Sequence, residues 1–323
     1  MDVRNVYHRL KDASRYAILT PDGRFELFCA ALANAIILII IMIVSYLLEG
    51  SIQSIRSSGI DFVIGSRWDV NRDIFGALPF IAGTLYTSAI AILIGVPISI
   101  GVAIYLSEMA PDWVRAPLGF VIELLAAVPS VIFGFWGIFT LRGFLRDSVE
   151  PALNDTLGFL PFFEGNPTGM DKFAAGLILA IMIIPTVSAI SREVMRAVPN
   201  SQREAALALG ATKQEMISGA VIGYAKSGIF GASILGLGRA VGETMAVTMV
   251  IGNKNSFSWS LLDPGQTMAS IIAINWWEAD SGSLYQSALI EIGLVLFGIM
   301  LIINVIGRIL VGKMIRLREG AVG

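Results

Sequence analysis

Six apolar stretches, each long enough to cross a bilayer as a helix, limit how this chain can fold. They lie at about residues 25–48, 77–107, 113–140, 173–191, 226–251 and 284–311. A transmembrane helix needs roughly 20 apolar residues to span about 30 Å of hydrocarbon. Only 15% of the residues are charged, against about 25% in soluble domains. The sequence predicts an all-α, polytopic membrane protein with six transmembrane helices, of which the second and third are kinked at Pro97 and Pro129.

The distribution of lysine and arginine predicts the orientation of these helices. The segments before span one, between spans two and three, between spans four and five, and after span six hold 15 of these residues. The alternate segments hold seven. Cytoplasmic loops carry the excess of basic residues in membrane proteins. We therefore expect a multi-pass protein of the cell (plasma or inner) membrane with both termini in the cytoplasm.

The spans divide the chain into four parts. Residues 1–24 form a cytoplasmic tail, which is either an amphipathic helix lying on the membrane or a partly disordered segment. Residues 25–72 hold the first transmembrane helix and an external loop. Residues 73–312 hold a core of five transmembrane helices, and residues 313–323 form a second cytoplasmic tail.

A polar segment at 192–225 separates the fourth and fifth spans. Ser201, with Glu204 three residues later, matches the capping box that begins many helices. Gly210 is a natural left-handed stop, so a short helix is expected over 202–209.

A second short helix is expected directly after this glycine. Thr212 and Glu215 repeat the capping box, and the helix that they start leads into span five. Capping boxes are common, so these features fit two interpretations equally well. The segment is either a jointed pair of helices exposed to a partner or a loop that only connects two spans.

The segment resembles the EAA loop of the permease subunits of ABC importers. In that family, a Glu-Ala-Ala sequence and a later glycine mark a coupling helix that docks into a groove of the ATP-hydrolysing subunit. The resemblance assigns this ATPase-coupling role to the matching residues Glu204, Ala205, Ala206 and Gly210. The family's later Leu-Pro is replaced here by Ile222-Gly223, which leaves the second helix free to continue.

Further stretches narrow the resemblance to the permeases of phosphate importers. "ELLAAVPSVIFGFWG" (123–137) and "GLGRAVGETMAVTMVIGN" (236–253), with 75–108 and 149–163, are similar to the PstC family and less closely to the PstA family. The resemblance implies a type I, MetI-like permease that works by alternating access. The partners it implies are a PstA-like second permease subunit, two cytoplasmic PstB-like ATPase subunits and an external PstS-like phosphate-binding protein.

Arg239 and Glu243 are charged residues within the fifth apolar stretch. An arginine at mid-membrane costs about 2.5–3.5 kcal/mol on insertion scales, so Arg239 is expected to face protein or water. Its guanidinium suits bidentate binding of an oxyanion, and Glu243, four residues later, would partly neutralise it. The alternative is an ion pair that fixes packing, within the chain or with a partner subunit. Both residues are candidates for the substrate pathway.

Four further polar residues are candidates for the same pathway. Glu123 lies near the start of span three, where a side chain that reaches the membrane interface is an equal alternative. Thr84, Thr87 and Ser88 form a polar stripe in span two. Hydroxyls in membrane helices also bond to nearby carbonyls or pack against neighbouring helices.

The sequence lacks the motifs of an enzyme. "GRILVGKM" (307–314) approaches a nucleotide-binding P-loop, but Met314 stands where Mg²⁺ needs a hydroxyl. ATP hydrolysis is therefore expected on a separate subunit. Cys29 and His8 are the only residues of their types, so we expect no catalytic residues, no metal site and no cofactor. No basic, aromatic patch suits nucleic acid.

Three functions compete on this basis. The first is the permease subunit of an ATP-driven importer of inorganic phosphate, which forms the translocation pathway together with a second permease subunit. The second is a permease for a related oxyanion, sulfate or molybdate, which shares the same chemistry. The third is an ATP-independent carrier, which would have no use for a jointed helix exposed to a partner.

Overall fold

The computed structural model describes residues 21–319, and the side chains of residues 21–314. The predicted tails lie outside the described residues over 1–20 and 320–323. The long and short α-helices are α2 (Pro21–Ser58), α3 (Asp61–Ile64), α4 (Leu78–Ile104), α5 (Asp112–Ala127), α6 (Ser130–Trp136), α7 (Arg142–Phe144), α8 (Glu150–Leu157), α9 (Lys172–Arg196), α10 (Asn200–Ala208), α11 (Lys213–Glu215), α12 (Ile222–Gly242), α13 (Met245–Val250), α14 (Met268–Asn275) and α15 (Leu284–Glu319).

Shorter elements join these helices. They are the antiparallel strands β1 (Trp68–Asp69) and β2 (Ile74–Phe75), the 3₁₀ turn η1 (Val70–Arg72), and the π-helical turns η2 (Tyr105–Met109), η3 (Gly137–Leu141), η4 (Leu145–Val149) and η5 (Met216–Val221). Apart from the two-residue strands, the described chain is α-helical, as predicted.

Five continuous helical segments of the described chain are long and apolar enough to cross a membrane. They are Pro21–Ser58, Leu78–Met109, Lys172–Arg196, Lys213–Gly242 and Leu284–Met314. The sixth candidate is a pair of helical segments, Asp112–Ala127 and Ser130–Leu157, bent by 93°. Six spans, as predicted, are therefore reached when this bent pair is counted as one.

The kink predicted at Pro129 is a complete break. Val128, directly before it, has an extended ψ of 126°, and Pro129 is the N-cap of α6. A residue that precedes a proline is pushed out of the helical region by the proline ring, which explains why α5 ends here. Pro97, in contrast, lies within the continuous helix α4.

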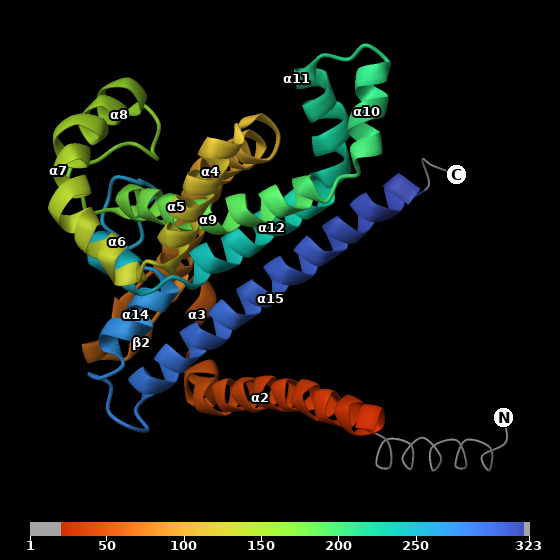
Figure 1. Cartoon of the computed structure of the whole chain (residues 1–323). Coiled ribbons are helices and arrows are strands. Elements are labelled where there is room, and N and C mark those ends of the chain that lie inside the picture. Colours follow the sequence, from red (N-terminus) through yellow and green to blue (C-terminus); the bar gives the residue numbers. More distant parts are fainter. Residues whose placement is uncertain (1–20, 320–323) are drawn as a thin grey trace, which may run out of the picture.

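Helices α4, α9 and α12 pack together at the centre of the molecule (Figure 1). A Cβ atom on Gly176 of α9 would lie 2.6 Å from the Cβ of Ile90 on α4. A Cβ on Gly95 of α4 would lie 2.8 Å from the Cδ1 of Ile183 on α9. Small residues on both helices therefore allow their backbones to approach closely, which is how membrane helices gain packing contacts.

The antiparallel pair of strands β1 and β2 is anchored by aromatic side chains. The ring of Trp68 meets Phe75 and Phe80 edge to face, with centroids 4.9 and 5.0 Å apart. Tyr285, at the start of α15, stacks on Phe75 at 5.7 Å. The segment predicted as an external loop thus folds into a small core that joins the starts of α4 and α15.

Helix α2 lies at the edge of the molecule and reaches the rest of it through its C-terminal part (Figure 1). Its contact with α15 is polar and close: Ser287 Oγ donates to the Gly50 carbonyl at 2.7 Å and accepts from the Ser54 amide at 3.0 Å. The side chains of residues 25–43 are exposed in the lone chain. This apolar surface suits lipid or another membrane subunit.

Candidate functional site

Arg239 lies in the last turn of α12 and reaches across to α9. Its Nη1 donates a hydrogen bond to Thr186 Oγ1 at 3.0 Å, and the residue is half-buried. Within residues 21–314, Arg239 forms no ion pair. A guanidinium has five N–H donors, so a single neutral partner leaves several free for an anion.

Glu243 does not extend the helix that carries Arg239. Helix α12 ends at Gly242, and Glu243 is extended, with φ −70° and ψ 130°. Its Oε1 accepts from the amide of Ala246 at 3.3 Å, in the first turn of α13. The expectation of a continuous span over 226–251, with Glu243 above Arg239 on one helical face, is wrong because the backbone turns between them.

The polar stripe of α4 is buried among helices. Thr84 Oγ1 donates to the Phe80 carbonyl at 2.8 Å and accepts from the amide of Met268 at 3.0 Å. Thr87 Oγ1 donates to the Thr84 carbonyl at 3.2 Å, and Ser88 is 2% exposed. These hydroxyls lie in a packed seam between α4 and the start of α14. Their place in a substrate pathway stays a prediction.

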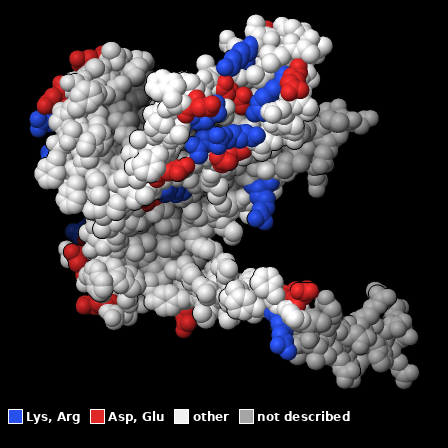
Figure 2. Space-filling model, in the orientation of Figure 1, with Lys and Arg blue, Asp and Glu red and all other residues white. Residues whose placement is uncertain are grey.

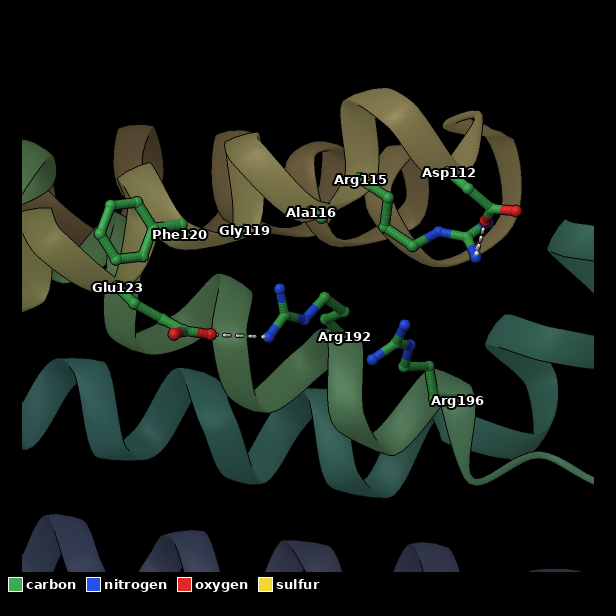
Figure 3. Close-up of a pocket in the computed structure, with 8 residues that line it drawn as sticks. All are labelled: Asp112, Arg115, Ala116, Gly119, Phe120, Glu123, Arg192 and Arg196. Carbon is green, nitrogen blue, oxygen red and sulfur yellow. Dashed lines mark hydrogen bonds and ion pairs between the residues drawn. The ribbon is translucent and has the colours of Figure 1, made fainter.

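Glu123 pairs with an arginine from α9. Arg192 Nη2 donates to Glu123 Oε1 at 3.2 Å, and the two side chains face a cavity of about 450 Å³ between α5 and α9 (Figure 3). The Arg192 side chain is 14% exposed, whereas that of Glu123 is 63% exposed. Glu123 therefore faces Arg192, a basic residue distant in the sequence that the spacing of residues did not suggest as its partner.

The segment that resembles the EAA loop projects beyond the packed helices as α10 and α11 (Figure 1). Glu204, Ala205 and Gly210 are exposed, and Ala206 is half-buried against the body. Gly210 has a φ of +87°, so the predicted left-handed stop is confirmed. Leu207 and Leu209, 48% and 90% exposed, give this projection an apolar surface with no cover in the lone chain.

One of the two predicted capping boxes is present. The Thr212 side chain accepts from the Glu215 amide, and the Glu215 side chain accepts from the Thr212 amide at 2.8 Å. The box predicted at Ser201 and Glu204 is wrong, since α10 begins at Asn200 without a side-chain cap. Pro199, whose ring fixes φ near the helical value, caps a helix that starts two residues earlier than predicted and leaves Ser201 inside its first turn.

An ion pair that sequence reasoning missed ties α10 to the body. Arg203 Nη2 and Nε bind the two carboxylate oxygens of Glu108 at 2.8 and 3.2 Å. The Arg203 side chain is 16% exposed and that of Glu108 is 7% exposed. Arg203 also donates to the carbonyls of Met195 and Val198, where α9 ends. One guanidinium thus joins α10, α9 and the end of the second span.

Two carboxyl groups are fully buried at the opposite end of α9. Asp171 Oδ1 accepts from the amide of Ala174 at 2.8 Å and so caps α9. Glu150 Oε2 accepts from the amide of Gly169 at 3.0 Å. Burial, with the added charge of Glu150, raises the pKa of Asp171 to about 8. Near-neutral solution therefore leaves a proton on this pair.

A metal ion has no evident place in the described chain. Among the side chains of residues 21–314, no group of three or more His, Cys, Asp or Glu could hold one. The charged groups of these sites are arginines paired with acids and buried carboxyl groups.

Comparison with known proteins gives a consistent result. The family described as binding-protein-dependent transport system inner membrane component matches residues 95–316. The phosphate transport system permease protein PstC of Xylella fastidiosa (strain 9a5c) is 42% identical, over 93% of this chain and 96% of its own length. The probable phosphate transport system permease protein PstC of Methanocaldococcus jannaschii is 34% identical, over 95% of this chain and 96% of its own.

A solved structure shares the fold. The inward-facing MetNI methionine ABC transporter superposes with a TM-score of 0.50 over 74% of this chain and 94% of that chain, at 15% identity. At this identity, the likeness concerns the fold alone, and it agrees with a MetI-like arrangement of helices.

Proposed function

The chain belongs to the family of binding-protein-dependent transport system inner membrane components, and we propose that it is the permease subunit of an ATP-driven importer of inorganic phosphate. Relatives that cover almost the whole chain bear the name of phosphate transport permeases in bacteria and in Methanocaldococcus jannaschii. These names favour phosphate over sulfate or molybdate as the transported anion. The protein is a multi-pass membrane permease, and not an enzyme.

The observation that carries the proposal is the projecting helix α10. It exposes Glu204, Ala205 and Leu207, and its Arg203 forms a bidentate, largely buried ion pair with Glu108 at the end of the second span. Charge-assisted, bidentate pairs are among the strongest and most directional hydrogen bonds in proteins. A force applied to α10 by an ATPase subunit would therefore move the ends of α4 and α9 with it.

The translocation pathway in this proposal passes Arg239. Its free donors suit the oxygens of phosphate, and its hydrogen bond to Thr186 orients the guanidinium without neutralising it. Glu243, at the break between α12 and α13, would lower the net positive charge along the route. Binding of the anion must be weak enough for release, and nearby negative charge serves that need.

The proposed complex contains a PstA-like second permease subunit, two cytoplasmic PstB-like ATPase subunits and an external PstS-like phosphate-binding protein. The orientation follows the distribution of basic residues, with both termini and α10 in the cytoplasm. The ATPase subunits would then meet the exposed surface of α10. The opposite end of the molecule, with α8 and α14, would face the binding protein.

Reconstitution of the complex in vesicles tests this proposal. Uptake of labelled phosphate should require the ATPase subunits and ATP, and excess unlabelled sulfate should not compete with it. The variant Glu204→Lys, still inserted and assembled, should hydrolyse ATP while losing most uptake. Uptake at the same rate without the ATPase subunits would mean that the chain is a carrier and would overturn the proposal.

A further inference from the structure

A hollow lined by three arginines opens between α5 and α9 (Figure 3). Arg115 comes from α5, while Arg192 and Arg196 come from the last part of α9. The hollow is separate from the contact between Arg239 and Thr186. Arg192 follows Thr186 on α9, and at 1.5 Å per residue its backbone lies about 9 Å farther along the helix. It is lined by Asp112, Arg115, Ala116, Gly119, Phe120, Glu123, Arg192 and Arg196.

Arg192 is held in place on one side and open on the other. Its Nη1 lies 2.8 Å from the position that a Cβ on Gly119 would occupy, so the absence of a side chain there gives the guanidinium its place. Its Nε is buried and makes no hydrogen bond within the described residues, although Glu193 Oε1 lies at ion-pair distance, 3.5 Å away. Its Nη2 binds Glu123 Oε1. A buried N–H without a hydrogen-bond acceptor is unfavourable, and an oxyanion in the hollow would supply that acceptor.

The carboxylates around the hollow lie at its exposed rim. The side chains of Asp112, Glu123 and Glu193 are 96%, 63% and 63% exposed, and Glu193 pairs with Arg196 at 3.7 Å. Exposed ion pairs of this kind contribute little to stability, so these acids can turn into solvent at little cost. Figure 2 shows acidic and basic side chains gathered near α10 on the visible face, where α9 ends.

We propose that this hollow binds a phosphate group, with Arg115, Arg192 and Arg196 as its ligands and the rim carboxylates as displaceable competitors. Arginine forks match phosphate oxygens bidentately, and an anion in the hollow would meet three of them. In the lone chain Arg115 and Arg196 each pair with one acid, and Arg192 pairs with two. The phosphate group belongs either to inorganic phosphate at the inner end of the pathway or to the headgroup of an anionic phospholipid. The first source rests on the proposed function, and the second is independent of it.

Two measurements on the full-length chain distinguish the sources. In nanodiscs of zwitterionic phosphatidylcholine, binding of labelled inorganic phosphate is titrated in the absence of any ATPase subunit. In detergent, retention of phosphatidylglycerol is measured by native mass spectrometry. The wild type is compared with the double variant Arg192→Gln/Arg196→Gln. Arg146→Gln is the control, because Arg146 is an arginine that is paired with an acid but does not line the hollow.

The double variant should bind the relevant probe at least about tenfold more weakly, since each charge-assisted hydrogen bond is worth about one decade or more of affinity. The control should bind like the wild type. Loss of phosphate binding identifies the free anion as the ligand, and loss of phosphatidylglycerol identifies the lipid. Unchanged binding of both probes by the double variant, or an equal loss of binding in Arg146→Gln, would overturn the proposal.

A variant that is expected to bind more tightly distinguishes a loss of the site from a loss of the fold. Glu123→Gln removes one competing carboxylate and should tighten binding about threefold to tenfold, a result that a damaged protein cannot produce. Weaker binding in this variant would count against the proposal. A chain that binds here but imports nothing in the complete transporter would refute only the proposed function. Import with no binding at the hollow would refute only this inference.

Discussion

The two ends of helix α9 handle charge in opposite ways. At its first end, the carboxyl groups of Asp171 and Glu150 are fully buried and bonded to backbone amides. At its last end, Arg192 and Arg196 pair with acids whose side chains are 63% exposed. A buried group keeps one geometry because any other leaves it unsatisfied, whereas an exposed pair exchanges partners at little cost. The first end of α9 is therefore a fixed anchor, and the last end is suited to movement and to ligands.

The largest effect is expected where the mobile end is fastened to α10. Arg203→Ala leaves the largely buried Glu108 without its bidentate partner, which typically costs about 3–5 kcal/mol. The free energy of unfolding in detergent should fall accordingly, and the assembled complex should hydrolyse ATP with little uptake. Lys213→Ala, on the exposed part of the same projection, is the control and should change neither. Normal uptake in Arg203→Ala would mean that this ion pair does not transmit force.

A second effect is expected at the middle of α9, where Arg239 meets Thr186. Arg239→Gln should lower the rate of phosphate uptake by about tenfold to a hundredfold, because a charge-assisted bond to the anion is worth about 1.5–3 kcal/mol. Arg239→Lys, which keeps the charge and loses the fork, should give an intermediate rate. Co-purification with the partner subunits measures assembly alongside uptake. Failed assembly in the Gln variant would favour a packing role for this arginine.

The buried carboxyl groups at the first end of α9 should make the stability of the protein depend on pH. The pKa of Asp171 is raised from 3.8 to about 8, so the native protein holds a proton that the unfolded chain lacks between these values. The contribution of Asp171 to stability should therefore fall as the pH rises from 6 to 8, by up to about 1.4 kcal/mol per pH unit. Asp171→Asn can still accept the Ala174 amide bond and should flatten the melting-temperature profile. An equally steep profile in the variant would contradict a shared buried proton.

The smallest effect is expected at the exposed pair. Glu123→Ala should change the free energy of unfolding by less than about 1 kcal/mol, since the carboxylate is 63% exposed. Added salt should remove even this difference because it screens exposed charges. Thermal unfolding at low and high ionic strength provides the measurement. A loss of several kcal/mol would mean that this pair is held as firmly as a buried one and would erase the contrast with the first end of α9.

Local sequence features predicted local structure well. The long apolar stretches gave the membrane helices because length and hydropathy alone decide whether a helix can span lipid. The capping box at Thr212 and Glu215 was predictable because both partners lie within one turn. The box at Ser201 failed for an equally local reason, since Pro199 begins the helix before it.

Contacts between residues far apart in the sequence could not be predicted from local patterns. Arg203 and Glu108 are 95 residues apart, and only the packing of α4 beside α9 brings them together. The pairing of Arg239 with Glu243 was inferred from helical spacing and fails because α12 ends between them. An acidic residue at the end of a span, such as Glu108, was the one sequence signal that could have suggested a basic partner nearby.

Helix α2 is attached to α15 by the hydrogen bonds of Gly50 and Ser54 with Ser287 and by the packing of the helices around them. The family match begins only at residue 95, well after this helix ends. Because the side chains of residues 25–43 are exposed, apolar substitutions there should leave the packing of this chain unchanged. Whatever covers this surface in the membrane, lipid or another subunit, comes from outside the chain.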